Sequence, residues 1–177
     1  MNALVKNMIR FMLFILVQVF VLDNIHLHQM LTPYIYFLFI LWLPFRIGRT
    51  QLMMIAFALG FTLDSFRHHP GFHTAACLLI AYIRPFLIGL LIPQEGADNN
   101  YEEPSIKSMG GVLPYLIFVG VLTLLHHGWL FFLEAWQFGN IWYFLVKTLL
   151  STVLSLVLIM ITELLFTRQQ KFRTNTV

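Results

Sequence analysis

The chain has 177 residues, of which 59% are hydrophobic and 11% are charged, with 18 phenylalanines and a formal net charge of +3. A water-soluble domain of this length could not bury so many apolar side chains, because small folds keep much of their surface in water. The basic residues are scattered singly, which argues against nucleic-acid binding, and the single cysteine, Cys77, excludes an intrachain disulfide. The composition therefore predicts an all-α integral membrane protein.

The first apolar segment covers about residues 4–23 and carries Lys6 and Arg10 near its start, as a signal peptide would. Signal peptidases require small residues at the cleavage site, but the sequence VQVFVLDNIH, which ends this segment and follows it, is bulky. We therefore expect the segment to remain as a transmembrane helix and the mature chain to begin near Met1.

Six transmembrane helices are predicted in a single domain over residues 1–177, because one bilayer crossing takes about 20 residues of helix. Thr32 and Pro33 suit the first turn of the second helix, while Pro44 and Gly48 suit its end. The connections are short except for a polar loop at 93–111, which we expect to be mobile. The expected spans are about 4–23, 32–46, 50–66, 72–92, 112–134 and 141–166.

The basic residues predict the orientation of the helices, because lysine and arginine near span ends are retained in the cytoplasm. In the six-span arrangement only Arg67 and Lys147 fall on the outer side. Both termini and the loop at 93–111 are therefore predicted to be cytoplasmic. The basic residues on the cytoplasmic side are Lys6, Arg10, Arg46, Arg49, Lys107, Arg168, Lys171 and Arg173.

Residues 56–85 form the centre of the predicted fold, because they join two apolar arms through one tight polar turn. Gly60 and Asp64 are four residues apart and share a helical face, so a close-packing position lies one turn from an acid. Pro70-Gly71 interrupts the helix between the arms. We expect the hairpin residues either to bind a partner or to pack within the bundle.

Three histidines, His68, His69 and His73, surround this turn beside Asp64 and could in principle hold zinc. However, Pro70 interrupts the helical spacing that would gather them around one ion. We expect histidines at the level of the lipid headgroups, no metal site and no cofactor.

Neither a catalytic centre nor a phosphate-binding loop is indicated. The sequence contains no G-x-S-x-G elbow, and Gly110-Gly111 lacks the lysine and serine of a P-loop. His126 and His127 are adjacent and point about 100° apart around a helix. A hydrogen-bonded role in the core is the favoured interpretation for this pair.

A permanent cation, Arg84, lies inside the fourth predicted span, immediately before Pro85. Such a charge costs at least about 2.5 kcal/mol in a bilayer unless a partner or snorkelling relieves it. Its expected partners are Glu163 or backbone carbonyls.

Another charged side chain, Lys147, lies near the outer end of the sixth span and can reach either Asp64 or Glu134. Pairing would relieve two desolvation costs together, and simple snorkelling is the alternative.

At the hairpin the chain resembles the MreD family of rod shape-determining membrane proteins, in the version found in Bacteroidetes-type bacteria. The resemblance covers most of the chain. Its strongest pieces are PYIYFLFILWLPF at 33–45, the G-x-x-x-D of Gly60 to Asp64, Gly71-Phe-His73, and AACLLIAYIRPF at 75–86. Arg67-His68-His69 departs from the small polar residues usual in the family.

The resemblance implies a non-catalytic subunit of the cell-elongation complex in the bacterial inner membrane. Its implied partners are MreC, MreB filaments, the RodA glycosyltransferase and a class B penicillin-binding protein. Folds of this family are also similar to the substrate-binding subunits of energy-coupling vitamin transporters, which gives an alternative function. Those subunits typically dock through an alanine-x-x-x-alanine face, whereas the first helix here has the bulky RFMLFILVQVF.

Overall fold

A computed structural model describes residues 3–25, 31–67, 71–92, 103–135 and 141–165. In this part of the chain the regular structure is helical, as the composition predicts. The first helix, α1, continues without a break as a π-helix and a 3₁₀ turn. The elements are α1 (Ala3–Leu16), η1 (Val17–Val21), η2 (Leu22–Asn24), α2 (Leu38–Leu41), α3 (Arg49–Arg67), α4 (Phe72–Leu91), α5 (Val112–Ala135) and α6 (Ile141–Leu165).

Four helical stretches are long and apolar enough to cross a membrane: Val5–Asn24, Phe72–Leu91, Val112–Glu134 and Ile141–Leu165. This agrees with the prediction of a membrane protein. Six helical spans are not found in the described residues. Helix α3 has 19 residues but is less apolar than these four stretches, because polar and charged side chains lie near both of its ends.

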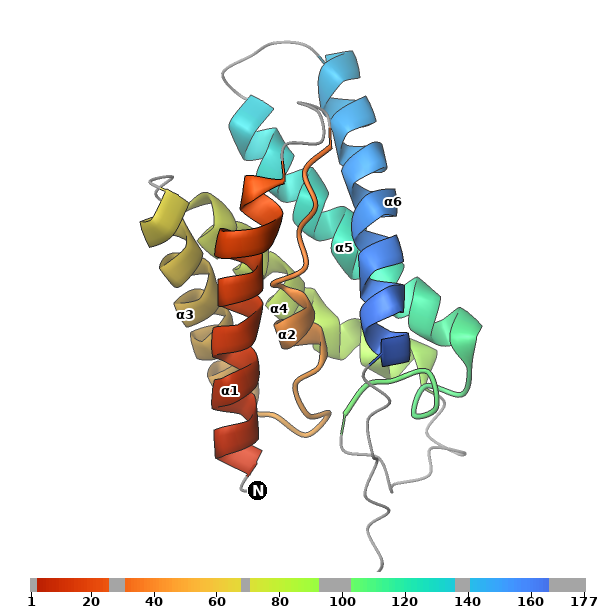
Figure 1. Cartoon of the computed structure of the whole chain (residues 1–177). Helices are drawn as coiled ribbons and strands as arrows, with labels where there is room; N and C mark the ends of the chain where they lie inside the picture. Colours follow the sequence, from red (N-terminus) through yellow and green to blue (C-terminus); the bar gives the residue numbers. More distant parts are fainter. Residues whose placement is uncertain (1–2, 26–30, 68–70, 93–102, 136–140, 166–177) are drawn as a thin grey trace, which may run out of the picture.

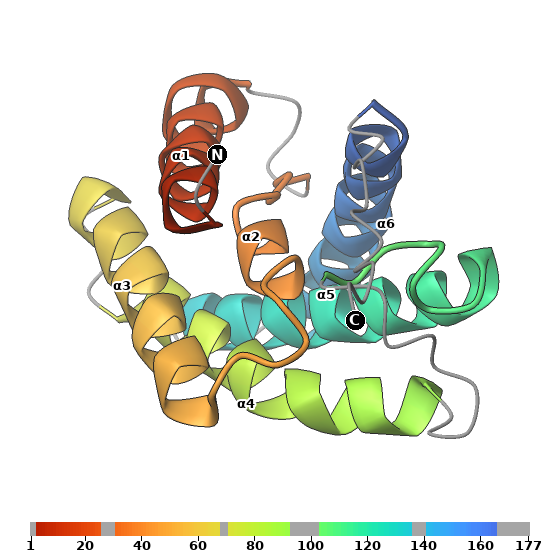
Figure 2. The same ribbon diagram turned by 90° about the horizontal axis from the view of Figure 1, so that it is seen from below.

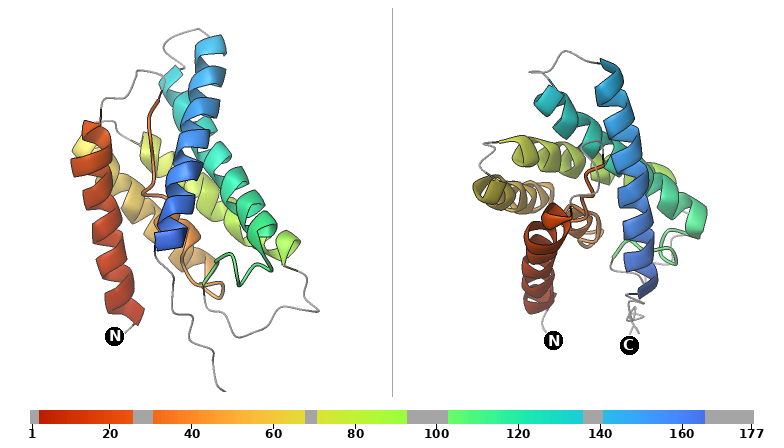
Figure 3. Two further views of the ribbon diagram at one scale, coloured as in Figure 1. Left: turned by 45° about the vertical axis from the view of Figure 1, so that its right-hand side comes forward. Right: turned by 45° about the horizontal axis from the view of Figure 1, so that its top comes forward.

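Helices α3, α4 and α5 pack in sequence order and form a curved wall, and α6 packs on α5. Helix α1 lies at the opposite end of this wall, so that residues 31–48 run between α1 and α6 (Figure 2). The start of α1 and the end of α6 point toward the same end of the bundle, as the views in Figures 1 and 3 agree. We call this the lower end, as in Figure 1.

The predicted helix at 32–46 is wrong. Only the four residues of α2 are helical, and residues 32–35 before them have no helical structure. All ten side chains from Tyr34 to Leu43 are at most 7% exposed. This segment fills the interior of the bundle, so it is apolar on every side and cannot be told from a lipid-facing helix by hydropathy.

An ion-pair cluster ties the first turns of α1 to the chain before α5. Lys6 and Arg10 are one helical turn apart, and both bind Glu103, at 3.0 Å and 2.9 Å. Burial opposes ionisation of Glu103, but the charges and hydrogen bonds of Arg10 and Lys6 hold its pKa below the usual value.

This cluster predicts acid sensitivity. The stabilisation that ionised Glu103 provides is fully present above its unfolded pKa, near 4.5, and is lost as the pH falls through the lower folded value. Glu103→Gln should cost about 1 to 3 kcal/mol at neutral pH. Thermal unfolding at pH 7 and pH 3 checks this, because the gap between wild type and variant should narrow at pH 3. A gap that is equal at both pH values would contradict the role of this carboxylate.

Candidate functional site

A cluster of buried and partly buried polar side chains surrounds the non-helical residues 31–37 in the upper half of the bundle. We call it the polar core. The side chains come from η1, η2, α3, α4, α5, α6 and the segment before α2, so the cluster exists only when the bundle is assembled. Its members are Gln18, Asp23, Tyr34, Tyr36, Asp64, Arg67, His73, His126, His127, Ser151 and Ser155.

Two serines of α6 bind one edge of the extended segment. The Thr32 amide donates to Ser151 Oγ and the Tyr34 amide to Ser155 Oγ, each at 3.1 Å. Alternate residues of an extended chain are about 6.6 Å apart. Residues i and i+4 of a helix are separated by about 6.0 Å along its axis. The two spacings therefore match, so two serines one helical turn apart can accept hydrogen bonds from the amides of two alternate residues that point toward α6.

Gln18 binds the opposite edge of the segment. Its Oε1 accepts from the Ile35 amide at 3.0 Å, and its Nε2 donates to the Pro33 carbonyl at 3.2 Å and to Asp23 at 2.7 Å. The side-chain amide thus replaces a neighbouring β-strand. Non-helical backbone at membrane depth is tolerated only where protein groups satisfy it, and these contacts meet that requirement.

Removing the serines should weaken the bundle. In a Ser151→Ala, Ser155→Ala variant two backbone amides lose their acceptors, and His127 loses a donor, so unfolding should become easier by about 2 to 4 kcal/mol. Thr162→Val is the matched control on α6, because that hydroxyl bonds only to its own helix. Equal melting temperatures for the serine variant and the control in detergent would refute this anchoring role.

Arg67, the last residue of α3, joins three parts of the chain. Its Nε and Nη2 bind the Asp23 carboxylate, and Nη1 donates to the Tyr34 hydroxyl at 2.7 Å. The guanidinium carbon also lies 4.9 Å from the centre of the Tyr34 ring. From the sequence, Arg67 was predicted only as a charge on the outer side. In the structure its side chain links the end of α3 to the 3₁₀ turn η2.

The buried histidines form hydrogen bonds with hydroxyl groups. The Tyr36 hydroxyl lies 2.8 Å from His73 Nδ1 and 2.7 Å from His126 Nε2. His127 Nδ1 donates to the Thr123 carbonyl at 2.9 Å, so its Nε2 is free to accept from Ser155 at 3.1 Å. The prediction of a hydrogen-bonded core role for His126 and His127 is confirmed.

His73 is buried inside the protein, since it is only 1% exposed, so its side chain does not face lipid headgroups as expected. His68 and His69 lie outside the described residues. Within the described ranges no three His, Cys, Asp or Glu side chains are arranged to hold a metal ion.

Asp64 caps the start of α4 from the preceding helix. Its carboxylate accepts from the amides of Gly71, His73 and Thr74 at 2.9 to 3.2 Å, and from the Thr74 hydroxyl at 2.5 Å. Gly71 has φ of +91°, which few other residues adopt. At Gly60 an added Cβ would lie 2.4 Å from Thr74 Cα. Of the two roles expected for Gly60 and Asp64, the structure shows packing inside the bundle.

The predicted Arg84 to Glu163 pair is wrong. Arg84, 1% exposed, donates to the carbonyls of Leu43 and Leu41, which lie just beyond and at the end of α2. Glu163 accepts instead from the Tyr115 hydroxyl at 2.9 Å. Because α2 ends after one turn, its last carbonyls lack helical donors, and the guanidinium replaces them. Of the two expected partners, backbone carbonyls are therefore correct.

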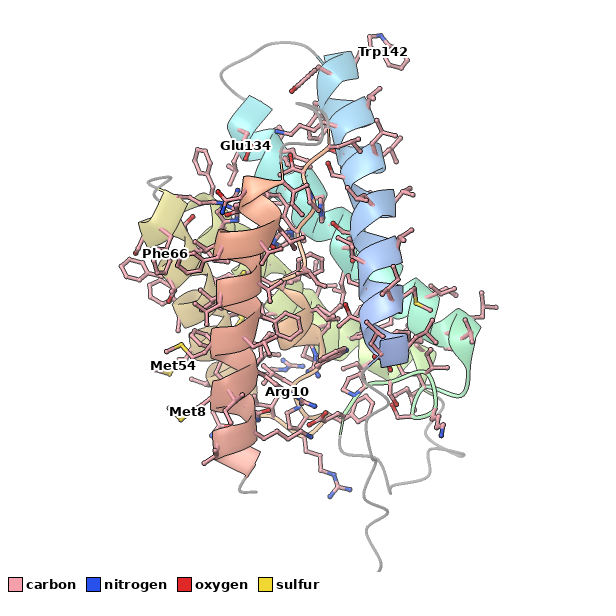
Figure 4. The ribbon with its side chains drawn as sticks, in the orientation of Figure 1. Met8, Arg10, Met54, Phe66, Glu134 and Trp142 are labelled. Carbon is pink, nitrogen blue, oxygen red and sulfur yellow. The ribbon has the colours of Figure 1, made fainter. Side chains whose placement is uncertain are left out.

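Lys147 pairs with Glu134 at 2.7 Å, which confirms one of the two partners expected from sequence. Its ammonium also lies 4.4 Å from the centre of the Phe131 ring. The pair links α5 to α6 near the upper end of the bundle, where Figure 4 labels Glu134.

Comparison with known proteins adds no relative: no family model, no curated protein and no solved structure matches the chain. In the part of the chain that the structure describes, the fold is that of an all-α protein with four helices able to span a membrane, packed around a buried segment that is helical only at α2.

Proposed function

We propose that this protein is a non-catalytic, multi-pass subunit of the cell-elongation complex in the bacterial inner membrane, and that it binds MreC there. The observation that supports this most is where the motifs of the MreD resemblance lie. Residues 33–45 contain the buried segment from Tyr34 to Leu43, and Gly60, Asp64, Gly71 and His73 hold α3 and α4 together beside it. Residues 75–86 carry Arg84, which holds the far end of that segment.

A second observation that supports the proposal is that the side chains of the polar core bind groups within the protein. The carboxylates, histidines and serines of the polar core bind backbone groups or other side chains of the polar core, so their hydrogen bonds hold the chain in shape. Side chains arranged in this way stabilise a scaffold. A binding role for the outer, apolar surfaces accords with that arrangement.

The proposed MreC-binding surface is the outward face of α3. Phe57 and Phe61 are 50% and 58% exposed and stack with ring centres 5.7 Å apart. Phe66 and Met54 project from the same helix (Figure 4). Since Gly60 and Asp64 are committed to the interior, the contact is assigned to these side chains and not to the glycine and acid.

The proposed orientation places both termini in the cytoplasm, as the basic residues predict. Arg10 lies toward the lower end of the bundle (Figure 4), and Arg49 is the first residue of α3, which begins toward the same end (Figure 1). This end would face the MreB filaments. RodA and the class B penicillin-binding protein would be reached through the complex.

The alternative, a substrate-binding subunit of a vitamin transporter, requires a cavity inside the bundle. Residues 34–43 occupy that interior with side chains such as Tyr36, Phe37 and Leu38, which are fully buried. We therefore retain the structural subunit as the proposed function.

Depletion of the protein in its rod-shaped host and capture of MreC from membranes test the proposal. Cells should become round, and Phe57→Ala with Phe61→Ala should reduce MreC capture about tenfold, since each aromatic anchor contributes about 1 kcal/mol or more to an interface. Leu149→Ala with Val153→Ala is the matched control, because these side chains are equally exposed on α6, at 58% and 60%. Two results would overturn the assignment: cells that stay rod-shaped after depletion, and undiminished capture of MreC in the absence of this chain's hairpin.

A further inference from the structure

Helices α3 and α4 leave a groove between them toward the lower end of the bundle. They approach most closely where Gly60 faces Thr74, since a Cβ there would meet backbone atoms at 2.4 to 2.9 Å. From this upper contact the two helices separate, as the view from below shows (Figure 2). The resulting groove has a volume of about 310 Å³.

The groove is apolar along its length and cationic at one end. Leu52 and Ala81, each 1% exposed, belong to its buried lining, while Tyr82 and Phe86 are 76% and 72% exposed on α4. Arg49, the first residue of α3, lines the groove and is exposed. Within the described part of the chain its guanidinium has no ion pair and no hydrogen bond.

We propose that this groove binds a phospholipid with an anionic headgroup, of the phosphatidylglycerol class. The acyl chain lies on the apolar lining, and the phosphate meets Arg49, which can bind two of its oxygens at once. The first amides of α3 lack helical acceptors and add positive potential at the same end. This cationic end complements an anionic headgroup and disfavours the ammonium of a zwitterionic one.

This inference rests on the proposed membrane location and not on MreC. Lipid retention is measured on the purified full-length chain without partners. A protein that retains no lipid would therefore not argue against MreC binding, and a protein that fails to bind MreC would not argue against the lipid site.

Native mass spectrometry of the protein in detergent, with phosphatidylglycerol or phosphatidylcholine added, tests the site. The wild-type protein should retain phosphatidylglycerol preferentially. Arg49→Gln should lower that retention about tenfold, as expected for loss of a charge-assisted contact. Arg49→Lys should retain most of it. Arg46→Gln removes the same charge outside the groove and should stay within about twofold of wild type.

Three results would overturn the site. They are equal retention of the two lipids by the wild-type protein, undiminished retention by Arg49→Gln, and an equal loss in Arg46→Gln, which would indicate a diffuse basic surface. Thermal unfolding of each variant establishes that the compared proteins are folded.

Discussion

Gly60→Ala is expected to destabilise the bundle by about 3 kcal/mol, a large effect for one methyl group. The added Cβ would lie 2.4 Å from Thr74 Cα and 2.7 Å from its nitrogen. Both are backbone atoms of α4, so the clash cannot be relieved by turning a side chain. The helices must separate, and the contacts beside Asp64 lengthen as they do.

Gly89→Ala is the matched control on α4. No atom lies within 4 Å of a Cβ built at that position. Alanine there should be neutral or stabilise the helix by up to about 1 kcal/mol. Chemical unfolding of both variants in the same detergent measures the difference. Equal stabilities would mean that α3 and α4 do not touch at Gly60.

Asp64→Ala should be at least as harmful, at about 3 to 5 kcal/mol. The carboxylate accepts from three backbone amides and the Thr74 hydroxyl, and its loss leaves those donors buried without an acceptor. Ser65→Ala, at the next residue, should change stability by less than about 0.5 kcal/mol, because the Ser65 hydroxyl is exposed and bonds only to its own helix. A stable, well-inserted Asp64→Ala protein would refute the cap.

Both expectations replace one drawn from sequence. Beside packing in the bundle, the sequence left open a partner-binding role for the G-x-x-x-D pattern, in which Gly60 and Asp64 variants would stay folded while losing a partner. In the structure these residues hold the hairpin together, so a partner assay on such variants would measure unfolding. The aromatic pair on the outer face of α3 is the better test of binding.

Hydropathy and turn residues predicted the long helices well. The apolar runs that became α4, α5 and α6 begin and end close to the predicted positions, and Pro70-Gly71 marks the break before α4. These features are local, since they depend on helix length, capping and side-chain polarity within about 20 residues.

The buried segment could not be predicted in this way. Residues 34–43 are apolar in sequence whether lipid or protein surrounds them, and the groups that replace their helical hydrogen bonds lie far along the chain. Ser155, for example, is 121 residues from its partner Tyr34. The available signals were weak: a glutamine at position 18 inside an apolar span, and two serines one turn apart in α6.

The polar core was missed for the same reason. His73 was assigned to the headgroup level because it follows a polar turn, yet α4 begins at Phe72 and carries it into the interior. For Arg84 the sequence left Glu163 and backbone carbonyls open as partners. The short α2, whose last carbonyls Arg84 binds, is not visible in the sequence pattern.

Hydrogen exchange at the amides of residues 32–43, in the protein reconstituted in lipid, tests most directly the claim that this segment, helical only at α2, lies protected in the interior of the bundle. Slow exchange is predicted, comparable to α4. The Ser151→Ala, Ser155→Ala variant should exchange faster at residues 32 and 34, which lose their acceptors. Exchange of the whole segment within seconds in the wild-type protein, at the rate of an exposed loop, would contradict its burial inside the bundle.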